Sequence, residues 1–376
     1  MLDKNNVQRK KIRIMLISSF APPYGGLTTW SSEYMDSMKK KQVEIDTVNT
    51  NYVGAKQIVI GKRNILYECK RSCNIWKRVW KLSDRKQHIV HLCSPCSFMG
   101  CLRDMITIGL IRIKNPPVRV ILHCHCNLND YVGRRKRNIL VFRLLMKLID
   151  KVFVMNNQSL YFMRSNGYSN IVKIPNCLSE QKSRSDSKVL EIKRDKINIL
   201  FLGRQTYDKG IDIVIETAKI AYEKNENMFF HIVGDSNSYL EKLLPLPSNV
   251  AVYGRKNHGE ALQFLSQVDL LLFPSRTEGF PYVILEAMMF AKPVVSSDVG
   301  AIKEMLDGTG AIIINEFKGD SYYNAIKRLI DKRERREIGK KEQERYRQLY
   351  NPDNVANMIM SEYEKLCKSA ENVRKV

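Results

Sequence analysis

The chain has 376 residues, of which 44% are hydrophobic and 27% charged, so it has the composition of a globular protein and the length of two domains. No apolar run reaches about 18 residues, which excludes a bilayer-spanning helix, and the nine cysteines lack framework spacing, which excludes a disulfide scaffold and fits free thiols in a reducing cytoplasm. The net charge is +23, and residues 1–185 hold 33 Lys and Arg against 11 Asp and Glu. The first half therefore predicts an anionic partner such as nucleic acid, a membrane surface or a phosphate-bearing acceptor.

The first strand is expected at Ile12–Ile17, after a loose basic tail over residues 1–11. Gly25 and Gly26 follow it and precede a helix expected from about Trp30 to Lys40. Because glycine has no side chain, a glycine pair between a strand and a helix allows the backbone to approach a ligand closely. An ordinary strand–helix turn is the alternative.

Residues 62–86 are rich in Lys and Arg and place Trp76 and Trp80 at helical spacing. One interpretation is an interfacial helix that contacts a membrane. The other is a helix whose Trp face packs on a sheet while its cations face water. A strand at 88–93 and a helix at 100–113 are expected to follow.

The next strand, expected at 118–126, carries His123 and His125 on one face, since side chains alternate along a strand. Cys124 and Cys126 then point to the opposite face. The two histidines and the two cysteines cannot easily bind one ion, so no metal site is expected.

Arg134 and Arg135 open a basic run that leads into an amphipathic pattern at 138–149. This pattern is too charged to span a bilayer. A basic helix start is a suitable place for an anionic lipid carrier, and a solvated helix end is the alternative.

The second half alternates between apolar runs and helical patterns, which indicates an α/β domain at 197–350. Residues 181–196 are polar and form the expected linker after a first domain at 1–180. The expected strands and helices of the second domain lie at 197–203, 211–224, 228–234, 239–244, 250–253, 258–267, 269–273, 281–290, 293–296, 301–307 and 311–314.

Two cations stand just beyond the first strand of this second domain. Arg204 is at the strand's carboxyl end, and Lys209 lies just before the next helix. In doubly wound sheets ligands bind beyond the carboxyl ends of the strands, and such cations can neutralise a pyrophosphate without a metal. The chain has no Asp-x-Asp pair. The alternative is a pair of ordinary surface cations.

Two carboxylates, Glu278 and Glu286, follow the apolar strand at 269–273. Pro281 suits the first position of the helix between them, and a helix N-terminus binds anions such as a diphosphate. Glu278 in the loop and Glu286 one turn inside the helix are expected to face one cleft. Solvated positions for both are the alternative.

These motifs together resemble the retaining glycosyltransferases of the GT-B fold, family four (glycosyltransferases group 1), which include bacterial surface-polysaccharide transferases. The resemblance covers most of the chain and is carried by Gly203-Arg204…Lys209-Gly210, Glu278-x7-Glu286 and Lys292-Pro-Val-Val-Ser-Ser-Asp-Val-Gly300. It implies an α/β fold with two Rossmann-like doubly wound domains facing across a cleft. It also implies that a last helix within 351–376 packs back on the first domain.

The resemblance also implies roles for individual residues. Glu278 would contact the donor sugar, Glu286 the ribose, and Arg204 with Lys209 the diphosphate. The remaining implied residues are Gly25, Gly26, Gly279, Phe280 and Pro281 near the donor, Arg255 and Lys256 beside the base, His125 near the reacting carbon, and His123, Arg134 and Arg135 on the acceptor side. Cys126 stands where the family has a glycine, so the choice between His123 and His125 stays open. Cys177 replaces another family glycine, in the segment that closes the first domain.

The implied activity is transfer of a hexose-type sugar from a nucleotide diphosphate sugar, expected to be a UDP-sugar, with retention of configuration and without metal or cofactor. The expected acceptor is a lipid-linked or membrane-associated saccharide of bacterial surface polysaccharide assembly, met by a cytoplasmic protein peripheral on the inner face of the membrane. Alternatives are a nucleotide-sugar epimerase or hydrolase, and a non-catalytic basic binder of membrane or nucleic acid. The motifs lie in the nearly neutral half, which argues against a mere electrostatic binder and against nucleic acid as partner.

Overall fold

The computed structural model describes residues 11–53, 56–57, 65–180, 192–193, 195–235 and 238–374. It divides into two compact units, Met1–Asn176 with Pro352–Val376 (unit 1) and Cys177–Asn351 (unit 2). The division after Asn176 falls four residues before the boundary expected at 180. Most of the expected linker and residues 1–10 of the expected tail lie outside the described residues.

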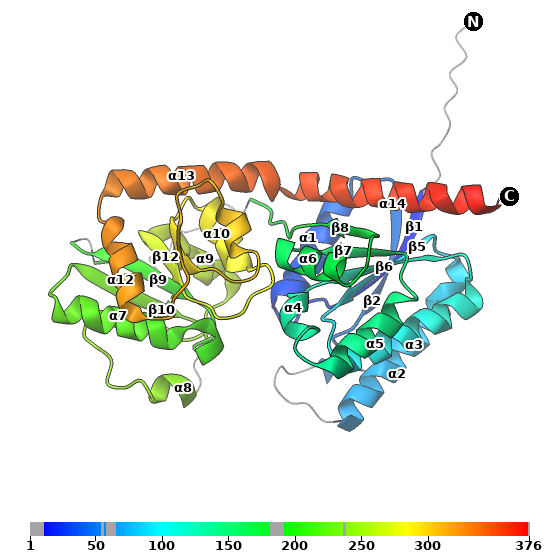
Figure 1. The fold of residues 1–376 in the computed structure, drawn as a ribbon, viewed down its shortest axis with the longest axis horizontal. Helices are drawn as coiled ribbons and strands as arrows, with labels where there is room; N and C mark the ends of the chain where they lie inside the picture. The colour runs from blue at the N-terminus through cyan, green and yellow to red at the C-terminus, as the bar shows by residue number, and fades with distance from the viewer. Residues whose placement is uncertain are drawn as a thin grey trace, which may run out of the picture. The chain divides into compact units, whose positions relative to one another are not determined.

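Unit 1 contains a six-stranded parallel sheet in the order β2-β1-β5-β6-β7-β8 (Figure 1). Its strands are β1 Ile12–Ser18, β2 Val43–Asn49, β5 Ile89–Ser94, β6 Arg119–Cys124, β7 Lys151–Val154 and β8 Ile171–Lys173. Its helices are α1 Gly26–Met38, α2 Ile65–Leu82, α3 Phe98–Lys114, α4 Leu128–Tyr131, α5 Lys136–Met146, α6 Asn157–Ser165 and α14 Pro352–Arg374. The central strands are buried throughout, because helices cover a parallel sheet on both faces.

Helix α1 begins at Gly26, one turn before the start expected at Trp30. The expectation was wrong because the apolar repeat of this helix begins only at Trp30, whereas its first turn is largely polar and partly exposed. The backbone N–H of Gly25 donates to Thr28 Oγ1 at 2.8 Å, which holds this first turn. The glycine pair is therefore the helix start itself and not a separate loop.

Helix α2 directs its apolar side chains inward more than outward. Ile75 and Val79 are buried, and the Trp76 indole N–H donates to Thr107 Oγ1 at 3.2 Å. Trp80 is 41% exposed, and the Lys114 ammonium lies 4.5 Å from its ring centroid. This arrangement favours the core-packing interpretation of the helix, with Trp80 at its edge.

Strand β6 ends at Cys124, so the strand expected to reach 126 is two residues shorter. His123 lies inside the strand and His125 lies beyond it. The His125 N–H still donates to Ser94 O at 3.0 Å, which extends the hydrogen-bonded edge by one residue. The two imidazole rings, 4.2 Å apart between centroids, are on the same side as alternation predicted.

Unit 2 contains a second six-stranded parallel sheet, in the order β11-β10-β9-β12-β13-β14. Its strands are β9 Ile197–Leu202, β10 Met228–Val233, β11 Val250–Val252, β12 Leu270–Phe273, β13 Val294–Ser297 and β14 Ile312–Ile314. Its helices are α7 Ile211–Glu223, α8 Ser238–Glu241, α9 His258–Gln267, α10 Tyr282–Met289, α11 Ile302–Leu306, α12 Gly319–Arg328 and α13 Lys332–Leu349. The elements for which bounds were expected lie within a residue or two of them, except that α8 ends at Glu241, three residues before the expected 244.

One detail of unit 2 differs from the expectation. Pro281 is the N-cap of α10, with φ −74° and ψ 124°, and the helix begins at Tyr282. An N-cap residue has an extended ψ. Pro281 therefore precedes the helix and is not part of its first turn.

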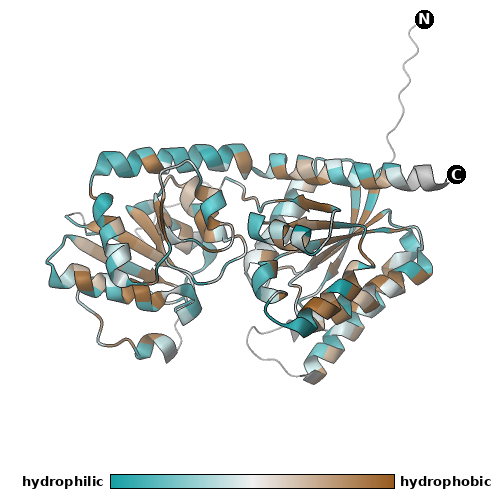
Figure 2. Ribbon diagram, in the orientation of Figure 1, coloured by the Kyte–Doolittle hydropathy of each residue, from teal (hydrophilic) through white to brown (hydrophobic). Residues whose placement is uncertain are grey.

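Each unit has its own apolar core, visible as brown strands in Figure 2. Helix α14 completes the core of unit 1. The Tyr363 hydroxyl lies 2.7 Å from the Tyr34 hydroxyl of α1, and Lys151 Nζ donates to Glu362 Oε2 at 2.7 Å. Among the described helices, none combines the length and the apolar character needed to cross a membrane.

Candidate active site

Glycine turns bring the carboxyl ends of three strands of unit 2 into close contact. At Gly234, after β10, an added Cβ would lie 1.8 Å from Gly203 O. At Gly210, before α7, it would lie 2.1 Å from Pro274 O, and the φ of +75° also favours glycine there. The loops that follow β9, β10 and β12 are therefore in direct backbone contact, which leaves no room for a side chain at Gly210 or Gly234.

Lys209 and Glu278 form an ion pair at this edge of the sheet. The Lys209 ammonium lies 2.6 Å from Glu278 Oε1, and the side chains are only 19% and 11% exposed. The Ser275 hydroxyl lies 2.8 Å from the same carboxylate oxygen. Charge-assisted hydrogen bonds of this kind are the strong ones, so the carboxylate has a fixed position at the end of β12.

The loop that carries Glu278 is held against a second turn. The Ala301 N–H donates to Gly279 O at 3.1 Å. Gly300 has a φ of +58°, and an added Cβ there would lie 2.3 Å from Glu278 O. The β12–α10 loop and the β13–α11 turn are thus packed backbone on backbone, which fixes the start of α10.

Arg204 is a largely exposed cation near this pair. Its side chain is 60% exposed, and its guanidinium lies 3.7 Å from the Asp208 carboxylate. Partial burial raises the pKa of Asp208, but a backbone hydrogen bond and the charges of Arg204 and Lys209 outweigh it, so the pKa is lowered. One carboxylate therefore lies in the field of both predicted phosphate-binding cations.

Glu286 has a partner that the sequence did not suggest. Its Oε1 lies 2.9 Å from Nε2 of His258, the first residue of α9. Glu286 is 6% exposed. The sequence signal was the capping box of Asn257 and Glu260, which marks a helix start at His258. Glu278 and Glu286 thus have separate partners, Lys209 and His258.

The other residues expected at the donor are less engaged. Arg255 is exposed, with Nε 3.7 Å from Asp235 Oδ1, and Lys256 is half-buried. The Phe280 ring is buried against Tyr350, with centroids 5.6 Å apart. Packing therefore occupies the face of the Phe280 side chain that contacts Tyr350. The half-buried Gly279 and the buried Pro281 flank Phe280.

Gly25 and Gly26, expected near the donor, and the acceptor-side candidates belong to unit 1. Gly25 and Gly26 are exposed at the start of α1. Arg134 is exposed and pairs with Asp130 at 3.2 Å, and Arg135 is the exposed N-cap of α5. Their roles toward a ligand remain predictions.

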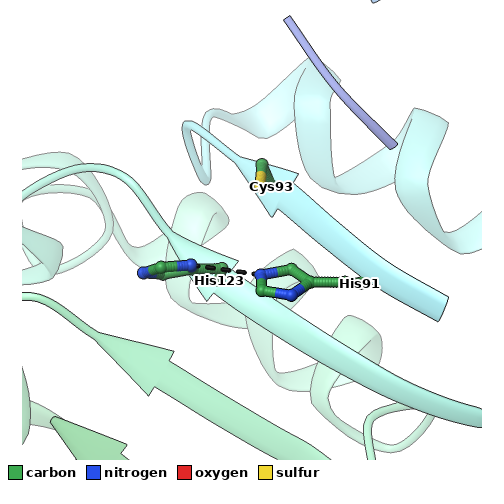
Figure 3. Close-up of side chains that lie close together, drawn as sticks. All are labelled: His91, Cys93 and His123. Atoms are coloured by element: carbon green, nitrogen blue, oxygen red, sulfur yellow. Dashed lines mark hydrogen bonds between the residues drawn. The ribbon is translucent and has the colours of Figure 1, made fainter. Parts of the chain in front are cut away.

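The two predicted histidines belong to a larger buried cluster. His91 Nε2 lies 3.1 Å from His123 Nδ1 (Figure 3), and His91 Nδ1 is hydrogen-bonded to the Tyr363 hydroxyl. The Trp30 ring contacts the rings of all three histidines. His91 and Tyr363 were missed because they meet only when α14 packs on the sheet.

Burial sets the charge of these histidines. It lowers the pKa of His91 to about 3 and, with the charge of His91, lowers the pKa of His125 to about 3. The pKa of His123 is also lowered by burial and by its two neighbours. Nε2 of His123 and of His125 are buried without a hydrogen-bond partner among the described residues. All three rings are therefore neutral near pH 7.

His91, Cys93 and His123 bring potential metal-ligand atoms within 4.8 Å of one another (Figure 3). The histidine nitrogens are largely engaged, because His91 Nε2 is hydrogen-bonded to His123 Nδ1 and His91 Nδ1 to the Tyr363 hydroxyl. Burial also raises the pKa of Cys93 well above its usual value, which disfavours a thiolate. We interpret the group as polar core packing.

Cys124 and Cys126 lie apart from these histidines, as strand alternation predicted. Both are buried in one apolar cluster with Cys96. The thiols and the imidazoles thus form two separate clusters on the two sides of β6.

Comparison with known proteins agrees with this geometry. Residues 182–345 match the family model described as Glycosyl transferases group 1. The chain therefore carries a domain of the glycosyl transferases group 1, as the motifs Gly203–Gly210 and Glu278–Glu286 implied.

Three curated relatives illustrate the relationship. An uncharacterized 41.2 kDa protein in the cps region of Klebsiella pneumoniae is 29% identical over 62% of this chain and 67% of its own length. The lipopolysaccharide 1,2-N-acetylglucosaminetransferase of Salmonella typhimurium is 25% identical over 65% and 67%. The alpha-D-kanosaminyltransferase of Streptomyces kanamyceticus is 32% identical over 38% of this chain and only 39% of its own length.

Solved structures show the fold. The sucrose-phosphate synthase of Thermosynechococcus elongatus superposes with a TM-score of 0.77 at 17% identity, over 96% of this chain and 100% of that chain. The lipopolysaccharide outer core galactosyltransferase WaaB gives 0.66 at 19% identity, over 93% and 100%. The expected GT-B fold, with two six-stranded parallel sheets flanked by helices, is confirmed.

Proposed function

We propose that this chain is a retaining glycosyltransferase that transfers a sugar from a nucleotide diphosphate sugar, a UDP-sugar in our proposal, to a hydroxyl of a lipid-linked or membrane-associated saccharide in bacterial surface polysaccharide assembly. The group 1 domain supports sugar transfer. A relative named for capsular polysaccharide biosynthesis in Staphylococcus aureus supports the process. Solved structures of similar fold described as complexes with UDP and UDP-glucose support the donor class.

The observation that carries the proposal is the Lys209–Glu278 pair at the carboxyl ends of β9 and β12. As the donor bond breaks, negative charge grows on the leaving diphosphate. Lys209, Arg204 and the first N–H groups of α10 would stabilise that charge, and a preorganised donor of this kind commonly contributes about 3 kcal/mol. Glu278 would position the sugar, and Glu286 the ribose.

In this proposal the acceptor hydroxyl attacks the face that the diphosphate leaves, and a departing phosphate oxygen accepts its proton. His125 would hold the sugar or the acceptor and would not be the sole base. Fixed cations replace a divalent metal, and no other cofactor is required. The protein would act at the cytoplasmic face of an anionic membrane, with no nucleic acid partner.

The test uses purified protein and a panel of labelled nucleotide-sugars. We expect binding of one donor, and an Arg204→Ala/Lys209→Ala variant that loses about 100-fold or more of that affinity. Transfer should continue in EDTA, and the product should keep the donor's anomeric configuration by NMR. Unchanged donor binding in the double variant, or a need for added Mn²⁺, would contradict the phosphate assignment.

An acceptor-dependence assay separates transfer from the rival reactions. Nucleoside diphosphate should be released in step with glycosylated acceptor. Release at the same rate without acceptor would indicate a hydrolase, and interconversion of the donor sugar would indicate an epimerase.

A further inference from the structure

Helix α3 turns an apolar stripe toward solvent. Its exposed residues are Met99, Ile106, Gly109 and Ile113, and the three side chains are 67%, 48% and 69% exposed. At about 3.6 residues per turn, the three apolar positions fall within about 40° of one another around the helix, with Gly109 beside them. A helix that faces only water carries polar residues on that side, so this stripe indicates a contact surface.

The cations of α3 do not make this stripe polar, because each is engaged by an acidic neighbour. The ion pairs are Arg103–Asp104, Arg112–Asp150 and Lys114–Asp84, with N···O distances of 2.6, 3.3 and 2.7 Å. The side chains of Arg103, Arg112 and Lys114 are also mostly covered, at 10%, 32% and 20% exposed.

Helix α5 combines exposed leucines with unpaired cations. Leu140 and Leu144, one turn apart, are 62% and 44% exposed. The exposed cations around them are Lys136, Arg137, Arg143 and Lys147. Residues 134–147 contain no Asp or Glu, and these four cations form no ion pair in the described part of the chain. The exposed side of α5 is therefore both apolar and strongly basic.

The two helices form one surface. Helix α3 packs against α5, and the Arg137 guanidinium lies 5.4 Å from the centroid of the Phe98 ring at the start of α3. In Figures 1 and 2 they lie side by side on one side of the sheet of unit 1, with brown and teal alternating along them. We call Met99, Ile106, Ile113, Leu140, Leu144 and the four cations of α5 the α3–α5 face.

We propose that the α3–α5 face binds an anionic phospholipid surface, with its cations at the lipid phosphates and its apolar side chains in the headgroup–acyl boundary. Interfacial helices of proteins bind membranes with this combination, and each cation near an anionic surface contributes separately. The inference deepens the proposed function, because it names the part of unit 1 that meets the membrane.

Charge and chemistry favour lipid over other occupants. A second copy docked face to face would bring two sets of unpaired cations together, which is unfavourable. A nucleic acid would use the cations, but exposed aliphatic side chains give it no stacking platform. A membrane is the partner that uses both parts of the face.

The test is co-sedimentation of the purified full chain with vesicles of phosphatidylcholine, alone or with about a third phosphatidylglycerol. The variants are Lys136→Gln/Arg143→Gln/Lys147→Gln for charge, Leu140→Ser/Leu144→Ser and Ile106→Ser/Ile113→Ser for the apolar part, and Lys332→Gln/Arg333→Gln/Arg336→Gln on exposed positions of α13 as the charge-matched control. Circular dichroism and a urea titration establish that each variant is folded.

We expect binding to anionic vesicles only, reduced about 100-fold by the charge variant, since three cations that each contribute separately are lost. Each apolar variant should lose about 10-fold, whereas the α13 control should stay within 2-fold. Absence of vesicle binding by the unmodified chain, or equal losses in the control and the charge variant, would overturn the proposal.

Two further outcomes assign the face elsewhere and also overturn the proposal. One is binding of duplex DNA, but not of vesicles, that the charge variant abolishes. The other is a dimer that Leu140→Ser/Leu144→Ser dissociates. Donor binding measured without vesicles separates the two proposals, because a chain that binds donor but not vesicles refutes only the membrane face.

Discussion

The ammonium of Lys209 lies 2.6 Å from the carboxylate of Glu278, although the residues are 69 positions apart in the chain. The pair joins the end of β9 to the end of β12, two neighbouring strands. The cation expected for the diphosphate and the acid expected for the sugar thus occupy one point. A diphosphate bound there would compete with Glu278 for Lys209.

Substitution of Lys209 is expected to impair the chemical step. In Lys209→Ala we expect kcat to fall about 100- to 1000-fold, because the charge that stabilises the leaving group is lost. Lys327→Ala is the matched control, since Lys327 forms an ion pair of 2.8 Å with Glu226 on the same unit. Steady-state kinetics measure both, and a Lys209 variant that matches the control would contradict the assignment.

Glu286 and His258 are expected to act as a unit in binding the nucleoside part of the donor. Glu286→Ala should weaken donor binding about 10- to 100-fold, the range for a hydrogen bond to a charged group. His258→Ala should have a smaller effect, because it only orients the carboxylate. Calorimetric titrations of the single and double variants measure the coupling free energy between the two residues. Strictly additive effects would show that Glu286 and His258 act independently.

Gly300 is expected to tolerate no side chain. In Gly300→Ala the Cβ would lie 2.3 Å from Glu278 O at a φ of +58°, so the loop must shift, at a cost of about 2 kcal/mol or more. Gly308 has a φ of +74° but nothing within 4 Å of its added Cβ, so Gly308→Ala should cost only about 1 kcal/mol. Urea unfolding measures both, and equal costs would refute the backbone-contact argument.

The buried histidines predict that stability falls in acid. The pKa of His91 and of His125 is about 3 in the folded chain and about 6.5 when unfolded, so the unfolded state binds more protons below pH 6.5. Stability is complete above that pH and is lost as pH falls toward 3. At pH 5 the loss is about 2 kcal/mol per histidine.

Urea midpoints at pH 7.5 and pH 5 measure this dependence. His91→Gln should reduce the difference between the two midpoints. Tyr363→Phe removes a hydrogen-bond partner of His91 but no group that titrates in this range, so it should lower both midpoints and keep their difference. A pH difference unchanged in His91→Gln would show that His91 does not contribute to it.

The strand and helix positions of unit 2 could be predicted because glycine, proline and apolar runs mark their ends. Strand β12, for example, is bounded by Asp269 and Pro274. The predicted start of α1, at Trp30, was wrong because the first turn of the helix is partly exposed and lacks the apolar repeat. The sequence thus predicts the bounds of an element where its buried residues are apolar and its exposed residues polar.

The residues of the candidate site were named from the sequence and stay predictions, whereas their partners in the fold could not be named. His91 and Tyr363 are 272 positions apart, and only the order of the sheet and the packing of α14 bring them together. The pairing of Glu286 with His258 likewise depends on the packing of α10 against α9. Contacts of this kind follow from topology, which no local pattern contains.

The residues of the α3–α5 face show the same limit. The tryptophans of 62–86 suggested an interfacial helix, but Trp76 is hydrogen-bonded to Thr107 inside unit 1. The stripe of α3 could not be distinguished from a core face, because its apolar residues continue around the helix. Which residues of α3 are exposed depends on which sides of this helix α2 and α5 cover.

Helix α14 gives the two units a fixed order of completion during synthesis. The ribosome finishes all of Cys177–Asn351 before it makes Tyr363, so the later unit can close its core while the earlier one still lacks its last helix. Until then Tyr34 and His91 lack their hydrogen-bond partner, the Tyr363 hydroxyl. A chain released after residue 350 would therefore present an unfinished first unit, a target for chaperones, beside a second unit that has all of its described helices and strands.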